Sequence, residues 1–288
     1  MGELRIGTCS WKYYSWRGIV YPQEGEYDYL EEYAQRFDTV EIDQWFWSLF
    51  DEKVVLPQPD DVERYAAAVP ADFRFTVKAP NSLTLTHHYS RDMDAPLNAN
   101  PHFLSPSLYR DFLARLEPLK DKVGLVMLQF EYLNKRKMAA QAEFLEKLEP
   151  FLESRPRDLP LAVECRNPRY LDEAYFRFLR RHDVHHVFCQ GYYMPLVWEI
   201  EAKRGDLLTG TSVVRLMGAN RKGIESRSGE RWNAIVDAKD DELAAIVPML
   251  QRLRRRLQRV YVNINNHYEG SAPLTVAKLK GLLADSTA

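Results

Sequence analysis

The chain has 288 residues and a formal net charge of −2, with 45% hydrophobic and 28% charged residues. This composition is that of an ordinary globular protein, and the length is sufficient for one large α/β barrel. No apolar run reaches the roughly 18 residues of a membrane span, and the near-neutral charge excludes a surface coated throughout with cations for nucleic acid.

Short apolar runs alternate with amphipathic stretches along the whole chain, which is the pattern of repeated βα units. The apolar runs predict strands at residues 4–8, 39–43, 73–78, 123–130, 161–165, 185–190, 212–217 and 259–265. The stretches between them predict helices at 28–37, 61–69, 107–117, 138–153, 172–182, 240–257 and 273–284. The sequence therefore predicts one TIM-type (β/α)₈ barrel domain over residues 1–288.

Several predicted strands carry ionisable side chains on the face that should point into the barrel. Residues two apart in a strand share a face, and Val40 and Ile42 suit packing beneath helices. Glu41 and Asp43 should then point inward, as should Lys78 at the end of its strand. The same rule places inside the barrel Gln129, Glu164, Arg166, Arg215, Asn263 and Asn265.

The expected ring is balanced in charge, because three carboxylates meet three cations. Barrel interiors are normally filled with branched apolar side chains, and a buried salt-bridge network seldom improves on an apolar core. A plug of salt bridges is the competing interpretation. The ring favours a pocket for a small polar or anionic substrate, with carboxylates available for proton transfer.

Aromatic residues follow the predicted strands, where the loops of barrel enzymes carry the active site. All six tryptophans lie in such segments, and we expect Trp11 and Trp45 to contact the substrate. Together with Tyr13, Tyr14 and Tyr21 the tryptophans would form an aromatic rim that can stack a base or a sugar. For any one tryptophan, anchoring of a loop is the alternative interpretation.

The segment after the seventh predicted strand contains glycines and the cations Arg221, Lys222 and Arg227. Loops after strands seven and eight frequently bind phosphate in this fold, so these cations are a candidate phosphate site. A mobile surface loop is the equally weighted alternative. There is no Walker or dinucleotide fingerprint, and no nucleotide cofactor is expected.

His87 and His267 follow the third and eighth predicted strands and could serve as acid, base or metal ligand. No HExxH or CxxC pattern is present, so no metal is assigned. If a divalent metal binds, its ligands would be Glu41, Asp43, Glu164 and His267. The three cysteines, an odd number, and the absence of a signal-peptide pattern favour a cytoplasmic location.

Seven segments together resemble a known family. They are IGTCSWKYYSWRGIVYP, YLEEYAQRFDTVEIDQWFW, FRFTVKAPNSLTLTHHY, VGLVMLQF, AVECRNPRYL, VVRLMG and YVNINNHYEGSAPLTVAKL. In this order they are similar to the family called domain of unknown function 72, or YecE-like, and they span nearly the whole chain. The resemblance implies a TIM-type barrel and brings no established reaction with it.

Our leading hypothesis from the sequence is an enzyme, a hydrolase or an isomerase/lyase, that acts on a small polar or phosphorylated substrate. Its catalytic residues would be Glu41, Lys78, Glu164 and His87. Its substrate contacts would be Trp11, Asp43, Trp45, Gln129, Arg166, Arg215, Asn265 and Asn266. The alternatives are a metal-dependent phosphodiesterase acting on nucleic acid and a non-catalytic nucleic-acid-binding module; no membrane partner is expected.

Overall fold

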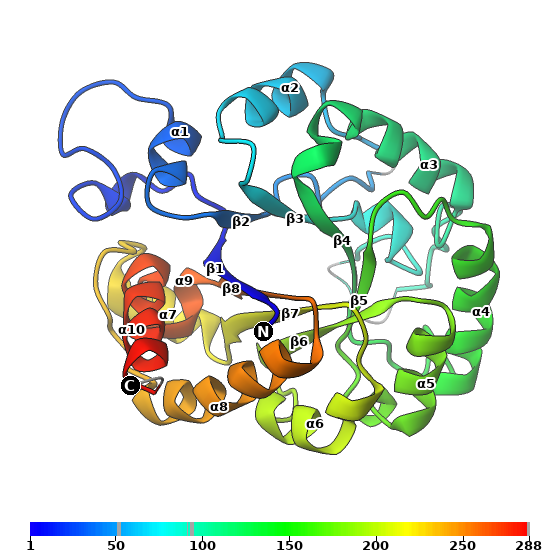
Figure 1. Cartoon of the computed structure of the whole chain (residues 1–288). Helices are drawn as coiled ribbons and strands as arrows, with labels where there is room; N and C mark the ends of the chain where they lie inside the picture. The colour runs from blue at the N-terminus through cyan, green and yellow to red at the C-terminus, as the bar shows by residue number, and fades with distance from the viewer. Residues whose placement is uncertain (51–52, 91, 93–94, 287–288) are drawn as a thin grey trace.

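The computed structural model describes residues 1–50, 53–90, 92 and 95–286, and Figure 1 shows a ring of strands surrounded by helices. The parallel strands close into a barrel in the order β1 to β8, with β1 paired to β8. They are β1 Glu3–Cys9, β2 Thr39–Ile42, β3 Arg74–Lys78, β4 Val123–Phe130, β5 Leu161–Cys165, β6 His185–Gly191, β7 Thr211–Gly218 and β8 Arg259–Ile264. Each strand begins and ends within one residue of its predicted range, which confirms the (β/α)₈ prediction.

The seven expected helices are present as α1 Tyr29–Ala34, α2 Pro59–Ala67, α3 Pro106–Arg115, α4 Gln141–Ser154, α5 Glu173–Arg181, α8 Asp240–Arg256 and α10 Ala272–Asp285. Three further helices were not expected: α6 Val197–Arg204, α7 Arg221–Ser228 and α9 Asn266–Glu269. All three are short, so an apolar stripe has little length in which to repeat. The expectation of a loop after β7 was wrong, because Asn220 caps a helix there by accepting a hydrogen bond from the Gly223 backbone.

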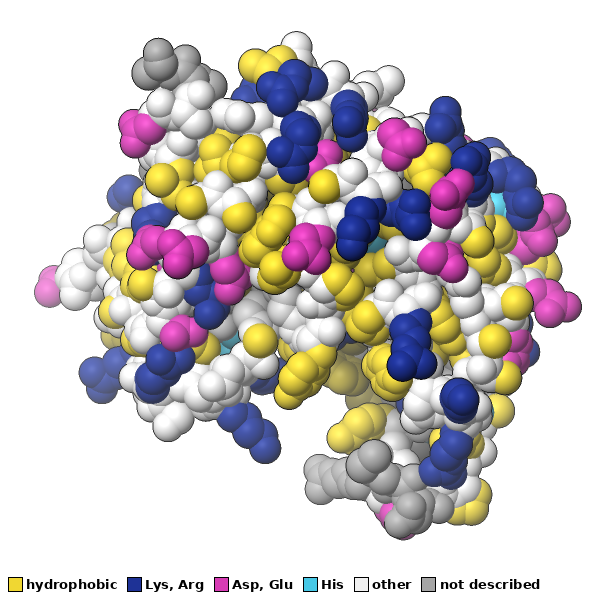
Figure 2. Space-filling model, turned by 90° about the horizontal axis from the view of Figure 1, so that it is seen from below, with side chains coloured by type: hydrophobic (Ala, Val, Ile, Leu, Met, Phe, Trp, Pro, Cys, Tyr) yellow, Lys and Arg dark blue, Asp and Glu magenta, His cyan; other side chains and the backbone are white. Residues whose placement is uncertain are grey.

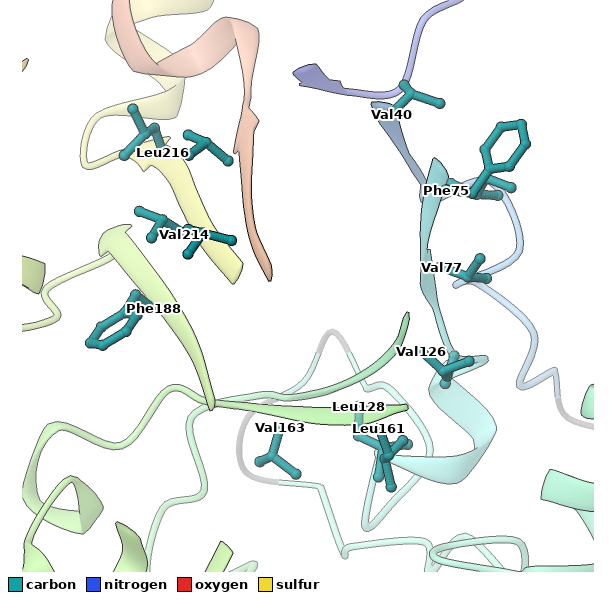
Figure 3. Close-up of a cluster of buried hydrophobic side chains, with 14 of the residues drawn as sticks. Val40, Phe75, Val77, Val126, Leu128, Leu161, Val163, Phe188, Val214 and Leu216 are labelled. Atoms are coloured by element: carbon teal, nitrogen blue, oxygen red, sulfur yellow. The ribbon is translucent and has the colours of Figure 1, made fainter. Parts of the chain in front are cut away.

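The outer face of the barrel is apolar, as the alternation predicted. Figure 3 shows Val40, Phe75 and Val77 pointing away from the centre of the ring. Residues of this kind are fully buried and belong to the main hydrophobic cluster. Because successive side chains of a strand point to opposite faces, Glu41, Thr76 and Lys78 must point inward.

The interior of the barrel is divided along its axis into an apolar part and a polar part. The apolar part is a separate cluster formed by Leu125, Met127, Ala162, Val187, Val213 and Tyr261. The polar side chains follow these residues toward the carboxyl ends of the strands; Gln129, for example, comes two residues after Met127 and pairs in register with Glu164. This apolar cluster therefore lies on the amino-terminal side of the polar side chains, which are nearer the carboxyl ends of the strands.

Gly7 in β1 lies where the backbone of β2 approaches most closely. A Cβ atom at this position would come within 2.0 Å of the Thr39 carbonyl oxygen. We expect Gly7→Ala to lower the free energy of unfolding by about 1–3 kcal/mol, the usual range for overpacking. Gly281 in α10 has no neighbour within 4 Å of such a Cβ, and Gly281→Ala should stabilise the protein by up to about 1 kcal/mol. Urea unfolding of both variants would check the opposite signs.

None of the helices in the described part of the chain is long and apolar enough to cross a membrane. Cys9, Cys165 and Cys189 are free thiols, and all of them are buried.

Candidate functional site

Arg215 of β7 lies at the centre of the polar part of the barrel interior and is only 2% exposed. We call this part, which includes Arg215, Glu41, Glu164, Gln129 and Lys78, the polar layer. Its Nε and Nη2 donate to the two carboxylate oxygens of Glu41 on β2, each at 2.7 Å. Its Nη1 donates to Glu164 of β5 at 2.5 Å and to Gln129 of β4 at 3.0 Å. One guanidinium thus joins side chains from four strands.

Glu164 is held by two arginines at once. Its second carboxylate oxygen accepts a hydrogen bond of 2.7 Å from Nε of Arg166. Burial acts to raise the pKa of Glu164, but the charges of Arg215 and Arg166 outweigh it and lower that pKa to about 2. A carboxylate with so low a pKa is a poor proton acceptor at neutral pH, which argues against the acid–base role expected for Glu164.

Glu41 has its oxygens equally occupied. Besides Arg215, Asn263 of β8 donates to Glu41 Oε2 at 3.1 Å and to the Thr76 hydroxyl at 2.8 Å. The Cys9 thiol lies 3.6 Å from the same oxygen. The alternation of the strands placed these side chains inside the barrel, and the structure brings them together there. Both glutamates form ion pairs with Arg215, so neither carboxylate is free of a cation.

Lys78 lies at the carboxyl end of β3 and is 7% exposed. Its Nζ lies 3.7 Å from the centroid of the Phe46 ring. Among the described residues it has no carboxylate within 4 Å, although Glu41 and Glu164 belong to the same layer. Burial, followed by the positive charge of Arg215, lowers the pKa of Lys78 to about 8. A buried lysine without an ion pair is rare, and it is the chemically distinctive group of this layer.

Asp43 follows β2 and lies above Glu41. Its pKa is raised, first because the carboxyl is buried and then because Glu41 is close. Lys78 and Arg215 act in the opposite direction, which shows that the Asp43 carboxylate lies within electrostatic reach of the lysine. No ion pair within 4 Å fixes Asp43 in the part of the chain that the structure describes. Among the described residues, Asp43 and Lys78 are therefore charged groups of the mouth that have no ion pair within 4 Å, and we call them uncommitted.

Arg166 reaches the same mouth from the end of β5, and its side chain is 19% exposed. Only its Nε is used by Glu164, and its guanidinium lies 4.4 Å from the ring centroid of Tyr192. Tyr192 and Tyr193 have positive φ angles of 53° and 63°, and Ser10 after β1 has 62°. Left-handed backbone is unfavourable for such bulky side chains and tends to accumulate at functional sites.

The carboxyl ends of the strands face a hollow. Figure 2 shows this end of the molecule along its lower edge, where the outline is hollowed between two lobes. Within the described residues, a cavity of about 550 Å³ lies beside the ends of β1 and β2. Its walls include Ser10, Trp11, Gln44 and Tyr65. Its other walls are Lys12, Tyr27, Asp28, Tyr29 and Arg64, so the cavity extends toward α1 and α2, and Asp43 and Lys78 are not among its lining residues.

The expected aromatic rim is only partly present. Trp11 lines the cavity and packs edge-on against Tyr65, while Trp45 stacks on that tyrosine with ring centroids 5.6 Å apart. Both tryptophans are themselves largely buried and belong to the edge of the main core. Trp16 and Tyr21 were wrongly placed in the rim, because they are almost completely buried in the main core. They anchor the segment after β1, as the alternative interpretation proposed.

Other expected site residues lie apart from the cluster. His87 hydrogen-bonds Thr86 at 2.9 Å, and the charges that act on it are Lys137 and Glu131. Asn265 accepts from the backbone and the ring of His267, at 2.9 and 2.6 Å. Their roles are local, so the expected catalytic role of His87 and the expected substrate contact of Asn265 have no geometric support.

Asn266 is likewise engaged by the fold. It is 2% exposed, and its side-chain oxygen accepts a hydrogen bond of 2.9 Å from the Ala272 backbone at the start of α10. The nearby His267 ring also meets Glu225 at 3.1 Å. These contacts hold the turn between α9 and α10 rather than the mouth of the barrel.

The candidate phosphate residues are on α7 and not on a loop. Arg221 donates to Glu225 at 2.7 Å, and Arg227 donates to Asp237 at 3.2 Å. Lys222 is exposed. Because two of the three cations are paired within the protein, the helix offers an anion less charge than the sequence suggested.

The alternative metal set is not assembled by the fold. Within the described ranges, no group of three His, Cys, Asp or Glu side chains is placed to hold a metal ion. Glu41 binds Arg215 with both oxygens, Glu164 binds Arg215 with one oxygen and Arg166 with the other, and His267 faces Glu225. The residues proposed as metal ligands therefore do not form one donor set.

Two contributors to the mouth were not anticipated individually. Phe46 supplies the ring beneath Lys78, and Tyr192 supplies the ring against Arg166. Both residues follow predicted strands, and this placement could have indicated them from the sequence. Several other aromatic residues also follow predicted strands, so the placement does not single these two out. The geometry of the loops selects among them, and the sequence pattern does not contain that geometry.

The sequence profile of the family described as "Protein of unknown function DUF72" matches residues 5–288 of the chain. The UPF0759 protein YecE of Escherichia coli K12 is 28% identical over 169 residues, which is 58% of this chain and 50% of YecE. The match thus spans about half the length of the curated relative. YecE of Escherichia coli O157:H7 matches with the same identity and the same coverage.

Two solved structures of DUF72 family proteins have the same fold. The protein from Thermotoga maritima MSB8 superposes with a TM-score of 0.68 at 23% identity, over 98% of this chain and 99% of that one. The protein from Enterococcus faecalis V583 gives a TM-score of 0.68 at 19% identity, over 98% and 95% of the two chains. These similarities establish the barrel fold and carry no statement about a reaction.

Proposed function

Because the chain belongs to the DUF72 family, whose description names no activity, we propose a function from the geometry of the site: an enzyme that binds a small anionic substrate at the mouth of the barrel and transfers protons with Asp43 and Lys78. The observation that supports the proposal is that some charged groups of the polar layer are ion-paired with one another and others are not. Arg215, Glu41 and Glu164 satisfy one another, whereas Lys78 has no carboxylate within ion-pair distance among the described residues.

The roles differ from those that the sequence suggested. Glu41 and Glu164 become positioning residues that hold Arg215, and proton transfer passes to Asp43 and Lys78. Burial moves the pKa of Asp43 upward and that of Lys78 downward to about 8, so both approach neutral pH, where acid–base catalysts are most effective. Lys78 and the unused nitrogens of Arg166 supply positive charge for the anionic group of a substrate.

Anion binding can be tested without knowledge of the natural substrate. We expect inorganic phosphate or pyruvate to bind to the purified protein in calorimetric titrations, and Arg166→Gln to weaken that binding at least about tenfold, since a charge-assisted pair is worth about 1.5–3 kcal/mol. Arg169 is exposed and is the matched control. Binding that is lost equally in Arg169→Gln, or absent from the unaltered protein for both anions, would contradict the proposal.

Proton transfer needs a separate measurement. In deuterated buffer, the protein should catalyse exchange of the pyruvate methyl protons, and Asp43→Asn should slow this exchange about 100-fold, which is a typical contribution of one general acid or base. Nuclear magnetic resonance follows the exchange directly. An Asp43→Asn variant that exchanges at the unaltered rate would remove Asp43 from the mechanism.

A further inference from the structure

The amine of Lys78 is placed for covalent chemistry and not only for charge. We propose that Lys78 forms an imine with the carbonyl carbon of a small substrate that also carries a carboxylate or a phosphate. This inference deepens the proposed function and rests on it. Three features of the mouth support it: the amine is free of ion pairs, its surroundings disfavour the proton, and a proton carrier lies nearby.

The first feature follows from the way the fold distributes charge. A buried lysine normally takes a carboxylate partner, and two buried carboxylates are present in the same layer. Both are engaged by Arg215, with hydrogen bonds of 2.5 to 2.7 Å. Arg215 thereby removes from Lys78 the partners that would otherwise keep the amine charged.

The second feature is the environment of the amine itself. The Phe46 ring covers Nζ at 3.7 Å and the side chain is 7% exposed, so little water can solvate an ammonium group. The ring face attracts a cation, which favours the charged form. Burial and the positive charge of Arg215 outweigh this attraction and bring the pKa of Lys78 to about 8. A desolvated lysine beside another cation is the usual arrangement of an imine-forming amine.

The third feature concerns the protons of the reaction. The neutral amine attacks the carbonyl carbon, the C–N bond forms, and the electron pair of the carbonyl π bond moves to oxygen, which takes a proton. The nitrogen loses a proton, the hydroxyl group leaves as water after a second protonation, and C=N forms. We assign the delivery and recovery of these protons to Asp43, whose charge acts on Lys78 and whose pKa is raised by burial. No oxidant or reductant is required.

The anionic part of the substrate has its own place. Arg166 uses only Nε in binding Glu164, and its Nη1 and Nη2 make no hydrogen bond to another described residue. A guanidinium edge of this kind binds a carboxylate or a phosphate through paired hydrogen bonds. The Tyr192 ring lies against the guanidinium, with 4.4 Å between Cζ of Arg166 and the ring centroid.

Reductive trapping tests the inference. The whole protein is treated at pH 7 with cyanoborohydride, which reduces imines, and with either glyoxylate or glyceraldehyde 3-phosphate, and the modified peptides are identified by mass spectrometry. We expect the Lys78 peptide to be modified at least about tenfold faster than the peptide of the exposed Lys203, because an amine with a pKa of about 8 has far more neutral form at pH 7 than an ordinary lysine. Trapping with glyoxylate alone would identify a carboxylate-bearing substrate, and trapping with the phosphate alone a phosphorylated one.

Variants separate covalent chemistry from charge. Lys78→Arg keeps the cation but cannot form an imine, so the rapid adduct should disappear, whereas Lys203→Arg should leave it unchanged. Modification spread over surface lysines with Lys78 unmodified would overturn the inference. If that result came with intact phosphate or pyruvate binding at Arg166, the imine alone would be wrong; loss of the binding as well would also refute the proposed function.

Discussion

Replacing Arg215 with methionine is expected to lower the free energy of unfolding at pH 7 by about 3–5 kcal/mol, the usual effect of removing one partner of a buried ion pair. The variant leaves the Glu41 and Glu164 carboxylates almost fully buried without the cation that binds both. The hydrophobic gain from methionine is too small to offset two desolvated charges. Urea unfolding followed by circular dichroism measures the loss.

The effect of this substitution should depend on pH with a definite sign. In the unaltered protein the pKa of Glu164 is about 2, below the ordinary 4.5, so its stabilising contribution is complete above pH 4.5 and is lost as pH falls toward 2. In the variant, Glu164 keeps Arg166 but loses Arg215, so less of the stability depends on its ionised form. The difference between the two proteins should therefore be largest near neutral pH and shrink below about pH 4.5.

Two controls make the result interpretable. Arg110 on α3 is exposed, and Arg110→Met should change the free energy of unfolding by no more than about 0.5 kcal/mol. Adding Glu41→Gln and Glu164→Gln to Arg215→Met should recover part of the loss, because the uncompensated charges are then gone. An Arg215→Met protein within about 1 kcal/mol of the unaltered one would show that Arg215 does not hold the layer together.

Much of the fold could be predicted because its signal is local. A strand reveals itself through alternation over a few residues, and Val40, Glu41 and Ile42 already show which side faces the helices. Helix α7 could not be predicted in the same way. Its sequence RKGIESRS has only Ile224 as a buried residue, so no apolar stripe distinguishes it from a loop.

The composition of the site was predictable, but its pairing was not. Alternation placed Glu41, Glu164 and Arg215 inside the barrel one by one. Which carboxylate each cation meets depends on the stagger of the strands around the closed ring, and Glu41 and Arg215 are 174 positions apart in the sequence. The roles followed from that pairing: the glutamates that looked reactive are neutralised, and Lys78 is not.

Lys78→Met is expected to stabilise the protein at pH 7 by about 2–3 kcal/mol, which is the opposite of what loss of a structural residue would do. The pKa of Lys78 is about 8 in the folded state, against 10.5 for an ordinary lysine, a difference of roughly 2.5 units or about 3 kcal/mol. Below pH 8 the amine is charged in both states, and the folded state bears the full desolvation penalty. Methionine has a similar length and carries no charge into that site.

The advantage of the variant should disappear at high pH. Above pH 8 the folded lysine is neutral while the unfolded lysine still binds a proton, so the unaltered protein gains about 1.4 kcal/mol per pH unit relative to Lys78→Met until about pH 10.5. Urea unfolding at pH 7, 8.5 and 10 would follow this convergence, with the exposed Lys203→Met as a control that shows no such trend. A destabilised Lys78→Met at pH 7 would mean that the amine has a stabilising partner. A stabilised one would show that the fold tolerates an unfavourable amine at its mouth, as expected where a residue is retained for chemistry and not for stability.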